Sequence, residues 1–215
     1  MANNSLWQED YWILLMQLYM RRPMGLKPLY SRQMMELCIE LHLTPHFVYG
    51  KMFELRNAAS ARLKRLWERY GDKPARLKRD AALVRSMAGF SKGDTFYEGV
   101  TIIETFEKDF RPIPKCGNIT PVMLILILDL YFRLVPATMN ENTPEIQELA
   151  RTMKTKATDI VKVMDVYQIL DPYLKRDELM ITPLLKPCQQ VWRRYGNGDI
   201  GELAAQAAQM KQYFE

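Results

Sequence analysis

The chain has 215 residues, and its ordinary balance of 48% hydrophobic and 26% charged residues excludes a disordered chain. Glycine is scarce, with 10 residues, and methionine is abundant, with 14, which favours helices over turn-rich sheets. The net charge is +5, and residues 1–111 carry this surplus because they hold 18 Lys and Arg against 13 Asp and Glu. Such a surplus suggests a polyanion or an acidic partner for the first half of the chain.

Cysteine usage and the apolar segments favour a cytoplasmic protein. Cys38, Cys116 and Cys188 are odd in number and far apart, so no disulfide framework is expected and a reducing compartment is the default. The first five residues lack the basic region and apolar run of a secretory signal. The apolar stretch Val122–Leu128 is too short to cross a bilayer, so it predicts a buried helix and no membrane partner.

Start and stop signals predict five helices in the first part of the chain. Ser5 opens a capping box, Ser31 can cap a second helix, and Thr44 precedes a proline at a first helical position. Pro23 and Gly71 mark the ends of two helices. Within each segment, apolar residues recur at three- and four-residue spacing. The expected helices lie within residues 5–22, 31–42, 44–57, 58–71 and 72–88.

The rest of the chain is also predicted to be helical. Residues 89–119 are expected to connect two halves and to contain one helix from Asp94 to Glu107. A Thr-Pro start signal then occurs at residues 120–121, 143–144 and 182–183, and an alanine-rich helix is expected from Asp199. No segment alternates with period two over a sustained length, so the sequence predicts an all-α fold.

Parts of the first half recur in the second. Residues 18–21, Leu-Tyr-Met-Arg, return at 130–133 as Leu-Tyr-Phe-Arg, an offset of 112. Residues 67–71, Trp-Glu-Arg-Tyr-Gly, return at 192–196 as Trp-Arg-Arg-Tyr-Gly, an offset of 125. An internal repeat of this kind indicates the structural unit from which the fold is built. We therefore expect an internal duplication, with two related multi-helix modules at residues 1–88 and 120–215.

Each module contains a segment with helix-turn-helix spacing. In each segment a small residue of the first helix is followed, three, five, ten and fourteen positions later, by residues that would fix the steep crossing angle between the two helices. The residues are Cys38, Leu41, Leu43, Val48 and Met52 in the first copy and Ala150, Met153, Thr155, Ile160 and Met164 in the second. This pattern, within residues 31–57 and 143–170, resembles the helix-turn-helix superfamily of phage repressors and bacterial regulators. His42 and Lys154 occupy the turn position that usually holds glycine.

The resemblance implies that the second helix of the hairpin enters a groove of double-stranded nucleic acid. In the first copy, its early positions offer His46, Tyr49 and Lys51. The basic stretch of residues 58–88 independently favours contact with phosphates, without sequence specificity. Its candidate residues are Arg62, Arg65, Arg69, Arg76 and Arg79. The leading hypothesis is a nucleic-acid-associated or regulatory protein that binds through these eight residues.

The main alternative is a helical protein–protein interaction module, or a homo-oligomer, that binds no nucleic acid. The basic residues would then form a solvated face whose aliphatic stems cover apolar surface. The aromatic pairs Trp67 and Tyr70, and Trp192 and Tyr195, fit the helical core better than a stacking surface.

Neither a metal nor an enzymatic role is expected. Cys38, His42 and His46 are spaced four apart, but Thr44 and Pro45 interrupt the helix that would bring them together, so no metal site is predicted. The chain has no glycine-rich phosphate loop, and its only two histidines lie in one hairpin. The sequence therefore predicts neither a cofactor nor a catalytic centre.

Overall fold

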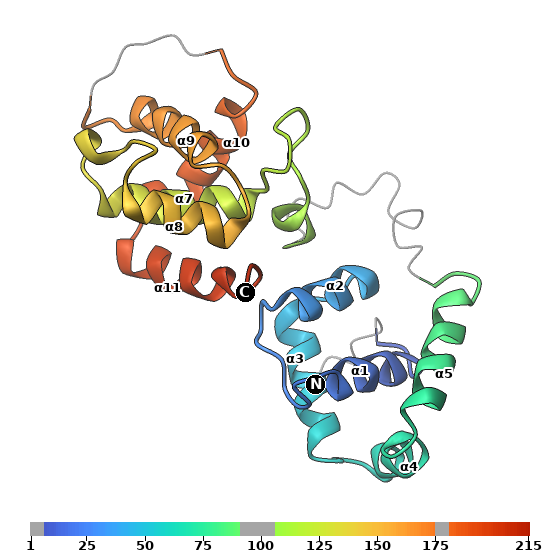
Figure 1. The fold of residues 1–215 in the computed structure, drawn as a ribbon. Helices are drawn as coiled ribbons and strands as arrows, with labels where there is room; N and C mark the ends of the chain where they lie inside the picture. The colour runs from blue at the N-terminus through green and yellow to red at the C-terminus, as the bar shows by residue number, and fades with distance from the viewer. Residues whose placement is uncertain (1–6, 91–105, 175–180) are drawn as a thin grey trace. The chain divides into compact units, whose positions relative to one another are not determined.

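The computed structural model describes residues 7–90, 106–174 and 181–215, and every regular element in these ranges is a helix (Figure 1). The predicted all-α fold is therefore confirmed. The chain divides into two compact units, residues 1–103 and 104–215. No helix in the described ranges has both the length and the apolar character needed to cross a membrane.

The first unit is built around its first helix. Its helices are α1 (Tyr11–Met20), α2 (Arg32–Leu41), α3 (Pro45–Arg56), α4 (Ala61–Tyr70) and α5 (Pro74–Ser86). In α1 the side chains of Leu14, Leu15 and Met16 are fully buried. Since α1 is apolar on several sides, it packs against α2, α3 and α5 together.

The helix starts of this unit agree largely with the sequence signals. Thr44 precedes α3, and Ser60 caps α4 by accepting a hydrogen bond from the Leu63 amide at 3.2 Å. The predicted capping box at Ser5 begins outside the described residues. The cap of α5 is Lys73 rather than Asp72, because the proline that follows takes the first helical position.

The second unit surrounds one apolar helix. Its elements are η1 (Phe106–Phe110), α7 (Pro121–Arg133), η2 (Pro136–Thr138), α8 (Pro144–Met153), α9 (Ala157–Leu170), α10 (Leu185–Val191), η3 (Trp192–Gly196) and α11 (Ile200–Lys211). All residues from Val122 to Leu128 are buried, because α7 contacts α8, α9, α10 and α11. The buried hydroxyl of Tyr167 in α9 donates a hydrogen bond to the Leu124 carbonyl of α7 at 2.9 Å.

Three features of the second half differ from the sequence expectations. The helix expected from Asp94 lies mostly outside the described residues, and its described end is η1, which packs against α7. The helix expected directly after Pro183 begins at Leu185, because the Thr182 hydroxyl first accepts the Leu184 amide in a turn at 3.3 Å. The segment Trp192–Gly196 is a π-helix, whereas the matching end of α4 is α-helical.

The two hairpins have nearly the same turn. Three residues join α2 to α3, and three join α8 to α9. His42 and Lys154, where glycine is usual, both adopt the left-handed conformation, with φ of 53° and 54°. The next amide in each turn bonds a carbonyl five residues earlier at 3.0 Å, Leu43 to Cys38 and Thr155 to Ala150. The residues expected to fix the crossing angle are buried in both hairpins except Thr155, which is half-buried.

In each unit the tryptophan of the repeated Trp-x-x-Tyr-Gly segment packs edge-on against a tyrosine of the first long helix. The ring centroids of Tyr19 and Trp67 lie 5.6 Å apart, and those of Tyr131 and Trp192 lie 6.0 Å apart. Trp67 also donates from Nε1 to the Leu55 carbonyl at 2.8 Å, which ties α4 to the last turn of α3. The predicted aromatic core positions therefore hold the helices of each unit together.

Candidate nucleic-acid interface

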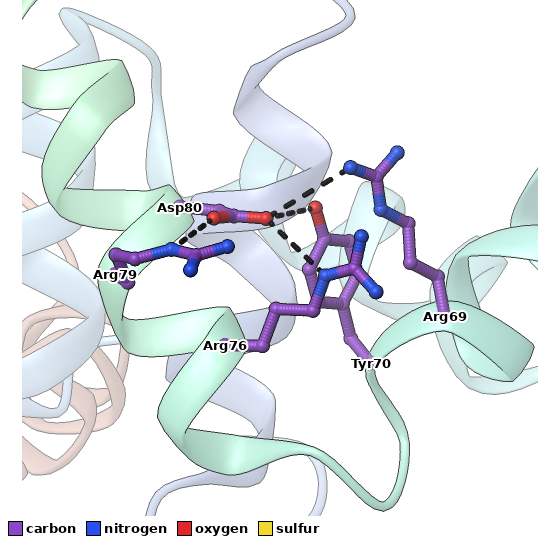
Figure 2. A network of polar contacts seen from close by, with 5 residues as sticks. All are labelled: Arg69, Tyr70, Arg76, Arg79 and Asp80. Atoms are coloured by element: carbon purple, nitrogen blue, oxygen red, sulfur yellow. Dashed lines mark hydrogen bonds and ion pairs between the residues drawn. The ribbon is translucent and has the colours of Figure 1, made fainter.

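Three arginines of the first unit converge on one carboxylate (Figure 2). Asp80 of α5 lies 3.1 Å from Arg79, 3.8 Å from Arg76 and 4.0 Å from Arg69. The hydroxyl of Tyr70 donates to Oδ2 of the same carboxylate at 2.9 Å. We call these five residues the arginine cluster.

The connection between α4 and α5 produces this arrangement. Only residues 71–73 separate the two helices, so the end of α4 lies against α5. Tyr70, the last residue of α4, is 2% exposed, and its hydroxyl reaches Asp80. Arg76 and Asp80 are four residues apart on α5 and therefore share a helix face. The guanidinium groups of Arg69 and Arg76 lie 5.2 and 5.9 Å from the centroid of the Tyr70 ring.

The electrostatics of the cluster keep its carboxylate charged. The hydrogen bond from Tyr70 lowers the pKa of Asp80, and Arg79 and Arg76 lower it further. The pKa of Tyr70 is raised, first by burial and then by its bond to Asp80. Three guanidinium groups against one carboxylate leave a local surplus of positive charge. The side chains of Arg69, Arg76 and Arg79 are 56%, 42% and 76% exposed, so they are open to an anion from solvent.

The remaining predicted arginines lie along α4. Arg62 forms an ion pair with Glu9 at 2.8 Å, and Arg65 is exposed and makes no ion pair with any described residue. Both line a groove of about 220 Å³ between α4 and the start of α1, where Glu9 and Asp10 form the opposite side, and Arg69 continues that groove to the arginine cluster. The structure therefore brings the five predicted arginines onto one continuous part of the first unit.

The predicted hairpin residues are placed differently. His46 is exposed in the first turn of α3, and Tyr49 is half-buried. The Lys51 ammonium lies 2.9 Å from Glu54 and 5.5 Å from the centroid of the Trp12 ring, so it is already engaged within the unit. The 12 residues of α3 span about 18 Å. Because α4 is tied to the far end of α3, the structure does not bring His46 together with the arginine cluster.

The sequence did not single out Asp80 or Tyr70 as members of this site. Tyr70 was expected in the core, which its burial confirms, but its hydroxyl extends to the surface cluster. The available signal was the four-residue spacing of Arg76 and Asp80, which places opposite charges on one helix face. The contact from Tyr70 depends on how α4 packs against α5 and has no local signal.

The cysteine and histidines of the first hairpin do not form a metal site. Cys38 is fully buried, and burial raises the pKa of its thiol to about 12, so it is not a thiolate at neutral pH. Within the part of the chain that the structure describes, no three His, Cys, Asp or Glu side chains are grouped closely enough to hold a metal ion.

Comparison of the chain with known protein families, curated proteins and solved structures finds no match. The chemistry of the arginine cluster is therefore the basis on which a ligand can be inferred. Guanidinium groups donate paired hydrogen bonds that fit phosphate oxygens, and they remain charged at any physiological pH. A phosphate is accordingly the anion that best fits three exposed guanidinium groups held around a fixed carboxylate.

Proposed function

We propose that this protein binds the phosphate backbone of nucleic acid through the basic surface of its first unit. The observation that carries the proposal is the convergence of Arg69, Arg76 and Arg79 on Asp80. The carboxylate orients guanidinium groups from two helices, while their outer N–H groups face solvent. The groove that continues past Arg62 and Arg65 favours an extended polyanion over a single small anion.

The proposed binding is chiefly independent of base sequence. Arg, Asn and Gln make the paired contacts to base edges, and His46, Tyr49 and Lys51 include none of them. We infer that α3 contributes a shape that follows the duplex, as in the helix-turn-helix proteins it resembles, while the arginines supply the affinity. This makes the chain a binding protein, not an enzyme. We also assign it to the cytoplasm, which its three free thiols favour.

The test is duplex binding, measured by fluorescence anisotropy across a salt series with the full chain. Each phosphate contact contributes about 0.9 to the slope of log affinity against log salt concentration. Replacing Arg69, Arg76 and Arg79 together by Gln should therefore weaken binding at low salt and reduce the slope by up to about 3.

A matched variant separates a site from a general charge effect. Replacing the exposed Arg133, Arg151 and Arg193 of the second unit by Gln lowers the net charge by the same amount. This second variant should bind duplex almost as wild type does. The proposal fails if the unchanged protein binds no duplex at low salt, or if both triple variants lose affinity equally.

We further infer that the two units arose by duplication. Both contain, in the same order, a buried helix, a hairpin with a left-handed turn, a tryptophan-bearing segment and a closing helix. The two tyrosine–tryptophan pairs support the same inference. The second unit, with balanced charge, would then serve as a scaffold.

A protein-binding role is the second candidate, and one observation on α5 favours it. Leu83 of α5 is 60% exposed, and Met87, the residue directly after the end of α5, is 46% exposed. Contiguous exposed apolar surface marks sites where partner chains bind. Sedimentation of the unchanged protein and of the double variant Leu83→Ser/Met87→Ser tests for a homo-oligomer, and a monomer in both cases removes self-association as the explanation.

A further inference from the structure

Each unit has a pocket at the same place in its fold. In the first unit a pocket of about 70 Å³ lies among α1, α2 and α5, and in the second a pocket of about 360 Å³ lies among α7, α8 and α11. Seven of the nine residues that line the smaller pocket have a counterpart 112 positions later in the lining of the larger one. The apolar floors correspond as Leu14 to Leu126, Leu18 to Leu130 and Leu37 to Leu149.

A guanidinium group lines the pocket of the first unit and narrows it. Arg85 of α5 donates from Nε to Glu40 at 2.5 Å, from one terminal nitrogen to the other oxygen of Glu40 at 3.0 Å, and from its second terminal nitrogen to Gln17 at 2.8 Å. All three acceptors come from α1 and α2. The arginine therefore closes the unit by joining its first, second and last helices.

The second unit has no arginine in the position that corresponds to Arg85. The buried residues of the two closing helices correspond at an offset of 126, Ala81 with Ala207 and Val84 with Met210, which puts Lys211 at the place of Arg85. The acceptor Glu40 corresponds to Thr152, whose hydroxyl donates to a carbonyl of its own helix. Lys211 forms no ion pair with any residue that the structure describes. The small side chains Ala204, Ala207 and Ala208 leave the pocket open.

The pocket of the second unit is also more acidic than the pocket of the first unit. Gln17 and Gln33 of the first pocket correspond to Asp129 and Glu145 of the second, and Glu148 lies beside them. Oδ2 of Asp129 forms an ion pair with the guanidinium of Arg133 at 2.7 Å. Its other oxygen, Oδ1, is buried and has no hydrogen-bond partner among the described residues. A buried carboxylate oxygen without a donor is costly, so the second unit does not satisfy this carboxylate in the way that Arg85 satisfies both oxygens of Glu40.

We propose that the pocket of the second unit binds a guanidinium group carried on an aliphatic stem. The ligand supplies from outside what Arg85 supplies inside the first unit. Its guanidinium faces the carboxylates of Asp129, Glu145 and Glu148, while its stem covers the leucine and alanine floor. Three carboxylates against Arg133 and Lys211 leave one negative charge for the ligand to neutralise. The proposal does not depend on nucleic-acid binding, because all of its residues lie in the second unit.

The test uses n-butylguanidinium as the probe and the methyl signals of ¹³C-labelled alanine as the readout, in the full chain. Saturable shifts are expected for the methyl groups of Ala204, Ala207 and Ala208, whereas the buried methyl of Ala81 in the first unit should not move. The Asp129→Asn variant should bind the probe about tenfold more weakly, since it loses one of the three carboxylates that face the guanidinium. A titration with n-butylammonium should give weaker binding than n-butylguanidinium, because one nitrogen cannot make paired contacts.

A second titration distinguishes the sources of the ligand. A short peptide with one central arginine presents the same group on a polypeptide. Shifts with both the probe and the peptide identify the ligand as an arginine side chain of another protein, and shifts with the probe alone identify a small molecule. The absence of saturable shifts with either, or equal binding by wild type and Asp129→Asn, would overturn the proposal. Neither result would bear on duplex binding by the first unit.

Discussion

The hydroxyl of Tyr70 donates a hydrogen bond to Oδ2 of Asp80 at 2.9 Å, so a core tyrosine of α4 fixes the carboxylate around which three arginines gather. This bond is the largest cause of the lowered pKa of Asp80. In Tyr70→Phe the pKa of Asp80 should rise toward its ordinary value of about 3.9. A carboxyl-detected NMR titration measures this change.

The same contact makes stability depend on pH. The pKa of Asp80 is lower in the folded than in the unfolded state, so its contribution is complete above about 3.9 and is lost as the pH falls through the folded value. Tyr70→Phe should lower the Tm at neutral pH by about 4 °C, and this difference should shrink in acid. Tyr173→Phe, at a tyrosine that is 91% exposed, is the control and should change neither quantity. A Tm difference that stays constant down to acid pH would contradict the assignment.

Replacing Asp80 by Asn should strengthen duplex binding. The amide still accepts the Tyr70 hydroxyl, but the local surplus of positive charge increases by one. Affinity at low salt should rise roughly two- to tenfold, and the salt dependence should become steeper. Anisotropy titration of wild type and variant with the same duplex measures both. Weaker binding by Asp80→Asn would mean that the carboxylate orients the arginines more than it repels phosphate.

The helices could be predicted from sequence because their signals are local. Thr120 caps α7 by accepting the Met123 amide at 3.3 Å, as the Thr-Pro signal predicted. The contact of the Lys51 ammonium with the Trp12 ring was not predictable in this way, since it joins two helices that are distant in sequence. The inclusion of Tyr70 in the arginine cluster was not predictable either, because it depends on how α4 packs against α5. A periodic pattern identifies a buried ring but not the direction of its hydroxyl.

The glycine that ends the second Trp-x-x-Tyr-Gly segment is required because the ring of Trp192 leaves no room for a side chain. A Cβ on Gly196 would lie 2.6 Å from the buried ring of Trp192. The variant Gly196→Ala should therefore destabilise the second unit by about 1–3 kcal/mol through overpacking. Gly198→Ala is the matched control, because its nearest neighbour would lie at 3.6 Å, and it should stay within about 0.5 kcal/mol. Denaturant unfolding followed through the indole N–H signal of Trp192 reports on this unit, and equal effects of the two variants would refute the steric explanation.

The three thiols should differ sharply in reactivity. Cys38 and Cys188 are fully buried, with pKa values raised by burial to about 12, whereas Cys116 is half-exposed. One thiol should therefore react readily with Ellman's reagent in the native protein, and all three should react in denaturant. Burial also raises the pKa of Cys116, so its rate should keep increasing at pH values above the ordinary thiol range. Cys116→Ser should abolish the native reaction, and a persistent fast phase in that variant would show that one of the buried thiols is reached through opening of its unit.

The guanidinium of Arg85 offers a direct comparison between the two pockets. Arg85→Ala removes its bonds to Glu40 and Gln17 and leaves Glu40, whose side chain is 25% exposed, without its cation. Because the pair is partly solvated, we expect a loss of roughly 1–2 kcal/mol in the free energy of unfolding. Lys162→Ala removes a more exposed pair, with Asp159, within one helix and should cost less, about 0.5 kcal/mol.

Chemical rescue then tests whether the emptied pocket of the first unit accepts the missing group. Millimolar n-butylguanidinium should raise the Tm of Arg85→Ala more than that of wild type or Lys162→Ala, because only the first variant leaves Glu40 and Gln17 free to accept its donors. n-Butylammonium should rescue less, since it cannot span the two acceptors. Differential scanning fluorimetry measures all three proteins with both probes. An equal response of every protein would mean that the packing of α1, α2 and α5 does not define a guanidinium site. The correspondence between the two pockets would then give no reason to expect a guanidinium ligand in the second unit.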